Sequence, residues 1–145
     1  MILFCDTSAV VKLYVIEPQS ADLKRLVEEA EVVAVCRIAW AEAHAALSRR
    51  AREVVADAPA ISTAKRALAD DWPRYLVLEV TQSLVERAAR YADTFALRGY
   101  DSVQLAAAHE TALLAETPVT FACFDERLNK AALVLGMTAP FVAGP

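Results

Sequence analysis

The chain has 145 residues, of which 57% are hydrophobic and 23% charged, a balance typical of one globular domain with a substantial core. Fifteen basic and nineteen acidic residues leave a net charge of −4, which argues against binding a polyanion through bulk charge alone. No apolar run approaches the roughly 18–20 residues of a membrane span, and no basic segment of a secretory signal precedes Asp6, so we expect no membrane association.

Short β-rich runs alternate with longer helical runs along the chain, a pattern that predicts an α/β fold. We expect strands at Ile2–Cys5, Val32–Cys36, Tyr75–Val80 and Val119–Phe124, and a short edge strand in the tail. We expect helices at Ser8–Val15, Ser20–Ala30, Ala39–Val55, Ser62–Asp71, Thr81–Leu97, Asp101–Glu116 and Asp125–Leu135. Because no repeat, linker or low-complexity tract interrupts the pattern, we expect residues 1–145 to form a single domain.

Three cysteines, Cys5, Cys36 and Cys123, lie far apart and form no CxxC pair. Their odd number and spacing argue against a disulfide framework and against a zinc site. We therefore expect small buried thiols and a protein of the reducing cytoplasm.

Two aspartates come directly after predicted strands, Asp6 after the first and Asp125 after the fourth. Each also precedes a predicted helix, where an aspartate commonly caps the N-terminus, so capping alone would explain either of them. In open α/β sheets, however, ligands bind at the carboxyl ends of the strands. Two acids at strand ends are therefore expected to lie on one edge of the sheet.

Two further acids lie in helical stretches. Glu42 shares its helix face with small apolar residues, and an unpaired carboxylate there is costly unless it finds a cation. The alternative is a half-exposed Glu42 paired with Arg49. Asp101 begins the Ala-rich helix, where an N-cap role and a role as a metal ligand are equally compatible with the sequence.

If several of these carboxylates meet, mutual repulsion prevents all of them from ionising without a positive centre. Carboxylate oxygens are hard ligands, which select Mg²⁺ or Mn²⁺ over zinc. Such ions bind phosphate groups and activate water. The acid cluster of Asp6, Glu42, Asp101 and Asp125 therefore predicts metal-dependent phosphoryl chemistry.

Four segments in this order resemble PIN-domain proteins, and among them the VapC toxins of toxin–antitoxin pairs. They are Asp6–Tyr14, the helix that contains Glu42, Leu97–Ala108 and Phe124–Leu128. The resemblance covers nearly the whole chain. It implies a single Rossmann-like PIN domain over residues 1–145, with a mostly parallel central sheet of four to five strands flanked by helices.

The resemblance also implies an Mg²⁺- or Mn²⁺-dependent endoribonuclease that forms a homodimer and is inhibited by a VapB-type antitoxin. Asp6 and Asp101 would be the principal metal ligands, with Glu42 beside them and Asp125 binding directly or through water. Ser8 would assist the site. The family often has Thr or Ser where Cys123 stands, so a supporting role at that position is in doubt.

Other classes of site fit the sequence less well. A metal-free ribonuclease needs a pair of histidines, and we expect His44 and His109 to be structural. A phosphoacceptor receiver needs an acid at the end of its third strand, where Thr81 stands, and a haloacid-dehalogenase-type phosphatase needs one where Ser8 stands. A catalytically idle module that binds antitoxin or RNA without cleavage remains the alternative.

Some residues outside the acid cluster are candidates for binding partners. Arg49 and Arg127 share helices with Glu42 and Asp125, which makes them candidates for contacting the RNA backbone. The high apolar content predicts a groove for an antitoxin helix. Its candidate lining comes from Val10, Val11, Leu13, Tyr14, Leu23 and Leu26, some of which must fill the core instead.

Overall fold

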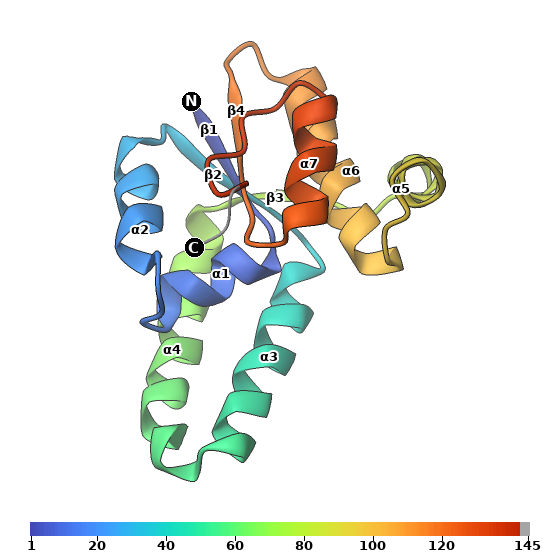
Figure 1. The fold of residues 1–145 in the computed structure, drawn as a ribbon. Coiled ribbons are helices and arrows are strands. Elements are labelled where there is room, and N and C mark those ends of the chain that lie inside the picture. The colour runs from blue at the N-terminus through green and yellow to red at the C-terminus, as the bar shows by residue number, and fades with distance from the viewer. Residues whose placement is uncertain (143–145) are drawn as a thin grey trace.

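The computed structural model describes residues 1–142 and consists of a parallel sheet with helices on both faces (Figure 1). The strands are β1 (Ile2–Cys5), β2 (Val32–Cys36), β3 (Leu76–Leu78) and β4 (Val119–Ala122). They lie in the order β3-β2-β1-β4, and all three pairings are parallel. The predicted α/β fold with a central parallel sheet is confirmed.

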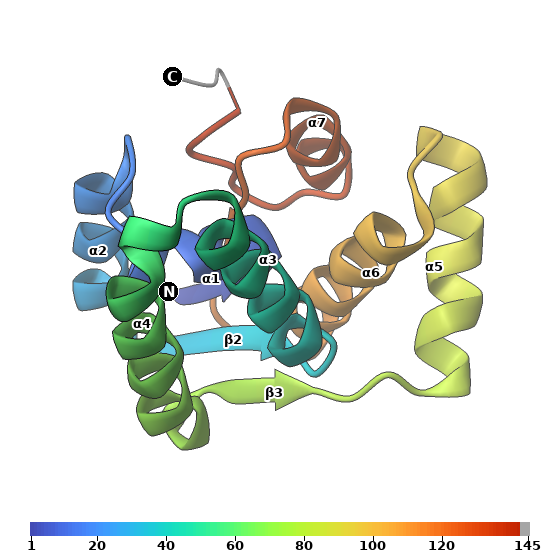
Figure 2. The same ribbon diagram turned by 90° about the horizontal axis from the view of Figure 1, so that it is seen from below.

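Seven α-helices surround the sheet within the described residues. They are α1 (Thr7–Tyr14), α2 (Ser20–Glu29), α3 (Ala39–Glu53), α4 (Ala58–Asp71), α5 (Gln82–Phe95), α6 (Gly99–Leu114) and α7 (Glu126–Val134). Short 3₁₀ turns at Val55–Asp57 and Trp72–Arg74 flank α4. Helices α3 and α4 form a hairpin that extends away from the sheet (Figures 1 and 2).

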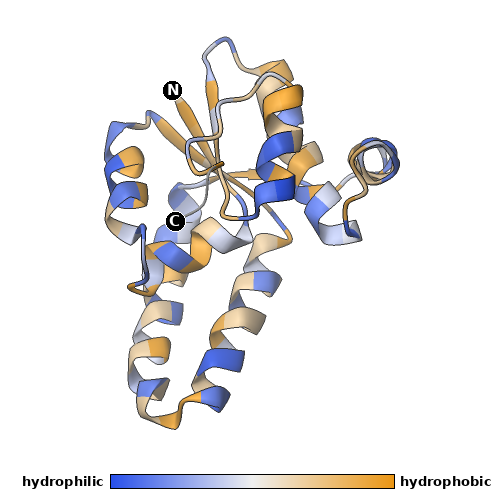
Figure 3. Ribbon diagram, in the orientation of Figure 1, coloured by the Kyte–Doolittle hydropathy of each residue, from blue (hydrophilic) through white to orange (hydrophobic). Residues whose placement is uncertain are grey.

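The strands separate two hydrophobic clusters because successive side chains of a strand point to opposite faces. Leu3 and Cys5 of β1 pack with residues of α1–α4, whereas Phe4 packs with residues of α5–α7. All three side chains are fully buried. This explains why the strands are hydrophobic throughout while most helices have one polar side (Figure 3).

The predicted bounds differ most from the structure in three elements, and the others differ by no more than two residues at either end. Helix α4 begins at Ala58, four residues earlier than expected, because Pro59 lies in its first turn, where a missing N–H costs nothing. Strand β3 covers only Leu76–Leu78. The expected edge strand of the tail is reduced to a single parallel bridge between Thr120 and Thr138, and residues 143–145 lie outside the described part.

The predicted antitoxin groove is wrong for half of its residues. Val10, Val11 and Leu23 are buried in the core between the sheet and α1–α4. Leu13, Tyr14 and Leu26 are partly buried against the same cluster, because the apolar sides of α1 and α2 face the sheet. All six side chains therefore stabilise the fold through these contacts.

The cysteines are free thiols, and all three are buried, as predicted. None of the helices in residues 1–142 is both long and apolar enough to cross a membrane.

The strand order creates a switch point between β1 and β4. From β1 the chain moves outward to β2 and β3, and it then returns to place β4 on the opposite side of β1. In sheets of this kind ligands bind outside the carboxyl ends of the two strands that flank the switch point. Asp6 follows β1 and Asp125 lies three residues after the end of β4, so both acids border this position.

Candidate active site

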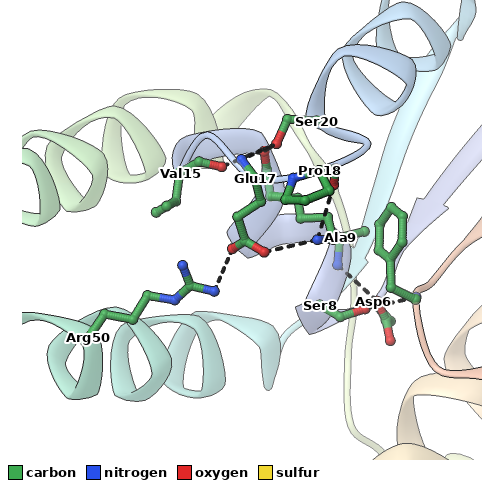
Figure 4. A network of polar contacts seen from close by, with 10 residues as sticks. Asp6, Ser8, Ala9, Val15, Glu17, Pro18, Ser20 and Arg50 are labelled. Atoms are coloured by element: carbon green, nitrogen blue, oxygen red, sulfur yellow. Dashed lines mark hydrogen bonds and ion pairs between the residues drawn. The ribbon is translucent and has the colours of Figure 1, made fainter. Parts of the chain in front are cut away.

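Asp6 lies where β1 ends and α1 begins, and it caps α1. Its Oδ1 accepts a hydrogen bond from the Ala9 amide at 3.0 Å and another from the Ser8 hydroxyl at 2.6 Å (Figure 4). The Ser8 Oγ in turn accepts from the Phe124 amide at 3.1 Å. Ser8 therefore joins the ends of β1 and β4. Since Oδ1 serves the cap, Oδ2 of Asp6 is the atom free of the capping interactions.

Asp125 has the same arrangement at the start of α7. It is the N-cap residue, and its Oδ1 accepts from the Leu128 amide at 2.9 Å. The sulfur of Cys123 accepts a hydrogen bond from the Asp125 amide at 3.3 Å. Burial and the nearby Asp6 raise the pKa of the Cys123 thiol far above its usual range, so this group stays neutral. The thiol can then donate to Asp6, which supplies part of what a hydroxyl would supply at this position.

Asp101 lies in the first turn of α6. Arg98 occupies the N-cap position of this helix, so the interpretation of Asp101 as the cap is wrong. Burial and the neighbouring carboxylates of Asp125 and Glu42 raise the pKa of Asp101, and the guanidinium of Arg98 opposes this shift. Asp101 therefore interacts electrostatically with acids from two other segments of the chain.

Glu42 lies in the first turn of α3 and is half-buried. Its Oε1 accepts from the Thr7 hydroxyl at 2.8 Å and from the Gln104 side-chain amide at 2.9 Å. Arg49, the alternative partner predicted from the sequence, instead forms an ion pair with Glu53. Neutral donors from α1 and α6 therefore fix the Glu42 carboxylate without neutralising its charge.

Thr7 and Gln104 were missed by the sequence analysis. Gln104 is 2% exposed, and its amide also donates to the Thr7 hydroxyl at 3.1 Å. Two signals in the sequence could have found it, since Gln104 is the one polar residue of the run Val103–Ala108 and follows Asp101 by nearly one helical turn. A buried amide in an apolar run requires polar partners.

The four acids influence one another although they come from four segments. The pKa of Asp6 is raised from 3.8 to about 6, mainly by burial. The charge of Asp101 also raises this pKa, while hydrogen bonds from Cys123, Ser8 and Ala9 oppose the shift. Within residues 1–142, no three His, Cys, Asp or Glu side chains lie close enough together to hold a metal ion. The acids are thus coupled without forming a closed ligand set.

A divalent metal ion can bind here without a complete set of protein ligands. Mg²⁺ keeps several of its waters and is commonly held by one or two carboxylates together with substrate phosphates. Asp6, at the switch point and coupled to Asp101, supplies hard oxygen donors of this kind. Repulsion between the two carboxylates is the electrostatic situation that a divalent cation relieves. The residues therefore fit an Mg²⁺ or Mn²⁺ ion.

Of the two arginines predicted to contact RNA, only one lies beside the acids. Arg127 lines the same hollow as Asp101 and Asp125, whereas Arg49 is exposed on α3 and lines none of the hollows that contain the acids. His44 bonds the Trp40 carbonyl within its own helix.

His109 forms a hydrogen bond with Tyr91, across the interface of α5 and α6. Both histidines therefore have local structural partners, as predicted, and they do not form a catalytic pair.

An ion-pair network supports α1 from its other end. The carboxylate of Glu17 binds the Lys12 ammonium at 2.9 Å and the guanidinium of Arg50 (Figure 4). Lys12 also lies over the Phe124 ring, 4.7 Å from its centroid. The network connects α1 with α3 and with the segment after β4, which fixes the orientation of the helix that begins at Asp6.

The chain is similar to known proteins in sequence and in fold. Residues 3–133 match the family model of the PIN domain. Ribonuclease VapC45 of Mycobacterium tuberculosis is 30% identical over 135 residues, which cover 93% of this chain and 92% of that protein.

Among solved structures, PAE2754 from Pyrobaculum aerophilum has a similar fold, with a TM-score of 0.70 and 21% identity over 99% of this chain and 90% of that one. The complex VapBC2 from Rickettsia felis, bound to a DNA fragment from its promoter, gives a TM-score of 0.64 and 12% identity, over 96% of this chain and 97% of the matched one. The family match and the ribonuclease relative both extend over most of the chain. The chain therefore belongs to the PIN-domain family, within the group of the VapC ribonucleases.

Proposed function

We propose that this protein is the toxin of a VapBC-type pair, an endoribonuclease that hydrolyses RNA phosphodiester bonds with the help of Mg²⁺ or Mn²⁺. The observation that carries the proposal is the placement of Asp6 and Asp125 on either side of the sheet's switch point, with Asp101 coupled to both. A carboxylate-rich site at this place is suited to binding a divalent cation and a phosphate together.

In the proposed mechanism each residue has a separate task. Asp6 and Asp101 would hold the ion, and Glu42, fixed by Thr7 and Gln104, would orient a water molecule. The bound ion supplies Lewis acidity toward the phosphate and lowers the pKa of water. Asp125 accepts a hydrogen bond from water at its Oδ2, because its Oδ1 caps α7. Hydrolysis by this route leaves a 5′-phosphate and a 3′-hydroxyl.

The decisive experiment is cleavage of a mixed pool of structured and single-stranded RNAs by the purified chain, with Mg²⁺, with Mn²⁺ and with excess EDTA. We expect cleavage only with a metal present and products that carry 5′-phosphates. Cleavage that resists the chelator, or products ending in 2′,3′-cyclic phosphates, would contradict the proposal. No cleavage under any condition would instead favour the idle binding module, which the lack of a closed ligand set in residues 1–142 also allows.

Replacing Gln104 by Leu should weaken metal binding without removing a ligand. The substitution keeps the side-chain size but deletes both donors that hold Glu42 and Thr7. Outer-sphere partners of this kind typically contribute 10- to 100-fold in metal affinity or activity, so we expect about a tenfold weaker apparent Mg²⁺ affinity. Isothermal titration with Mg²⁺ measures it. The exposed Gln82→Leu serves as the matched control, and equal affinities of the two variants would remove Gln104 from the site.

The partner and the cellular setting are part of the proposal. We infer that a VapB-type antitoxin binds the chain, since the similar Rickettsia felis protein is a VapBC complex, and that the toxin forms a homodimer. Three buried free thiols suit the reducing cytoplasm. Co-purification with the product of the neighbouring gene, and the mass of the isolated chain by light scattering, test the two associations.

A further inference from the structure

Two hollows adjoin the acid cluster and share a common border. The first, of about 710 Å³, lies between the Phe95–Arg98 turn and α7, and both Asp101 and Asp125 line it. The second, of about 570 Å³, contains Glu42 and Tyr100. Arg98 and Asp101 line both hollows. A ligand that crosses Asp101 can therefore occupy both of them at once.

The first hollow places three basic side chains beside three acidic ones, Asp101, Asp125 and Glu126. Arg98, Arg127 and Lys130 line it. Lys130 is paired with Glu126 at 3.0 Å, but neither arginine forms an ion pair within the described part of the chain. Guanidinium groups bind phosphate oxygens through two parallel N–H donors, so two arginines without an ion-pair partner in residues 1–142 can bind an anionic phosphate, while Arg98 also interacts with the Asp101 carboxylate.

The turn that carries Arg98 is held in place. Ala96 adopts a left-handed conformation with φ of 54°, which ends α5. Arg127 Nη1 donates to the Ala96 carbonyl at 3.0 Å and so connects α7 with this turn. The wall of the first hollow is therefore preorganised, which reduces the entropy lost when a ligand binds.

The second hollow presents an aromatic ring. Tyr100 lies in the first turn of α6 and is 65% exposed, and Val103, which lines the same hollow, adds apolar surface. The space beside Gly99 is open, since a Cβ at that position would contact nothing within 4 Å. An exposed ring of this kind can stack on an unpaired base, and such stacking tolerates any base because every base has a π-face.

We propose that the two hollows form one subsite for single-stranded RNA, with a backbone phosphate bound by Arg98 and Arg127 and the neighbouring base stacked on Tyr100. The proposal rests on the proposed function, because it assigns the RNA path beside the same acids. It predicts a preference for unpaired RNA, since a base within a duplex cannot leave its stack without cost. Tyr100 and Arg98 thus act in binding, outside the hydrolytic step.

The test is binding of a fluorescein-labelled, mixed-sequence single-stranded RNA 12-mer, measured by anisotropy with Mg²⁺ present. All proteins carry Asp6→Asn so that bound RNA is not consumed. Tyr100→Leu is expected to weaken binding about tenfold, whereas Tyr100→Phe keeps the ring and the affinity. Arg98→Gln should reduce the slope of log Kd against log salt by about 0.7, as expected for one lost phosphate contact. Arg66→Gln, an exposed arginine on α4, is the matched control.

The outcomes separate this inference from the proposed function. Equal affinities of Tyr100→Leu and Tyr100→Phe, equal salt slopes of Arg98→Gln and Arg66→Gln, or equal binding of duplex and single-stranded RNA would each overturn the subsite. Cleavage is read separately on the chain with Asp6 intact. If the chain with Asp6 intact cuts RNA but the Tyr100 and Arg98 variants bind RNA as their controls do, the subsite is contradicted and the nuclease is not. If binding depends on Tyr100 and Arg98 but the chain with Asp6 intact never cuts RNA, only the proposed nuclease activity is contradicted.

Discussion

Replacing Asp101 by Asn is expected to lower metal-dependent RNA cleavage by roughly 100- to 1,000-fold, the range seen when one electrostatic group of an active site is lost. Asp101 interacts electrostatically with Asp6, Glu42 and Asp125. Asparagine keeps the shape but removes the charge that binds a cation. Single-turnover cleavage at saturating Mg²⁺ measures the loss.

The fold should survive this change because Asp101 is not the cap of α6. Asp70→Asn makes the same chemical change on the exposed side of α4 and should leave cleavage unaltered. Thermal melts of both variants without metal should match or exceed that of the unsubstituted chain. Full activity of Asp101→Asn would remove this residue from the catalytic group.

Replacing Asp6 by Asn should stabilise the metal-free protein at neutral pH while abolishing cleavage. The pKa of Asp6 rises from 3.8 to about 6 in the fold, which corresponds to about 3 kcal/mol of destabilisation once the group is ionised. Asparagine can still accept the capping bonds from Ala9 and Ser8 through its Oδ1. Loss of the negative charge at the start of α1 offsets up to about 1 kcal/mol. The expected net gain is about 2 kcal/mol.

The sign of the pH dependence follows from the raised pKa. The folded protein keeps the Asp6 proton to higher pH than the unfolded chain, so this group's contribution is fully present below about pH 4 and is lost by about pH 6. Urea unfolding in EDTA should therefore show little difference between Asp6→Asn and the unsubstituted chain at pH 4, and the full difference above pH 6. A difference that does not change with pH would contradict the argument.

Adding Mg²⁺ should narrow the difference in stability between these two proteins. A cation that binds only the folded state stabilises it in proportion to the logarithm of its saturation, and Asp6→Asn lacks a ligand for it. The unsubstituted chain is thus expected to gain stability with Mg²⁺ while the variant gains less.

Sequence reasoning located the positions of the acids better than their partners. The ends of strands can be predicted because β-rich runs stop at turns and acids. The sequence therefore sufficed to place Asp6 and Asp125 at one edge of the sheet. Gln104 and Thr7 could not be placed, since their contact joins residues 97 positions apart. Pairing of Glu42 with Arg49 was plausible on helical spacing, but a long-range contact from α6 replaced it.

The sequence could not separate core residues from groove residues on α1 and α2 for a related reason. Amphipathic spacing identifies the apolar side of α1 and α2, but it does not tell whether that side faces the sheet or a partner. Val10 and Leu23 turned out to be fully buried in the core. The topology of the sheet, which decides this, depends on pairings between distant segments.

The capping role of Asp6 and Asp125 has a consequence for genetics. Because the Oδ1 atom of each aspartate starts a helix, alanine at either position removes a helix cap as well as a charge. A screen for harmless alleles of a toxin would recover such alanine variants whether the chemistry or the folding had failed. Amide replacements separate the two causes, so the informative alleles at these codons are those that encode asparagine.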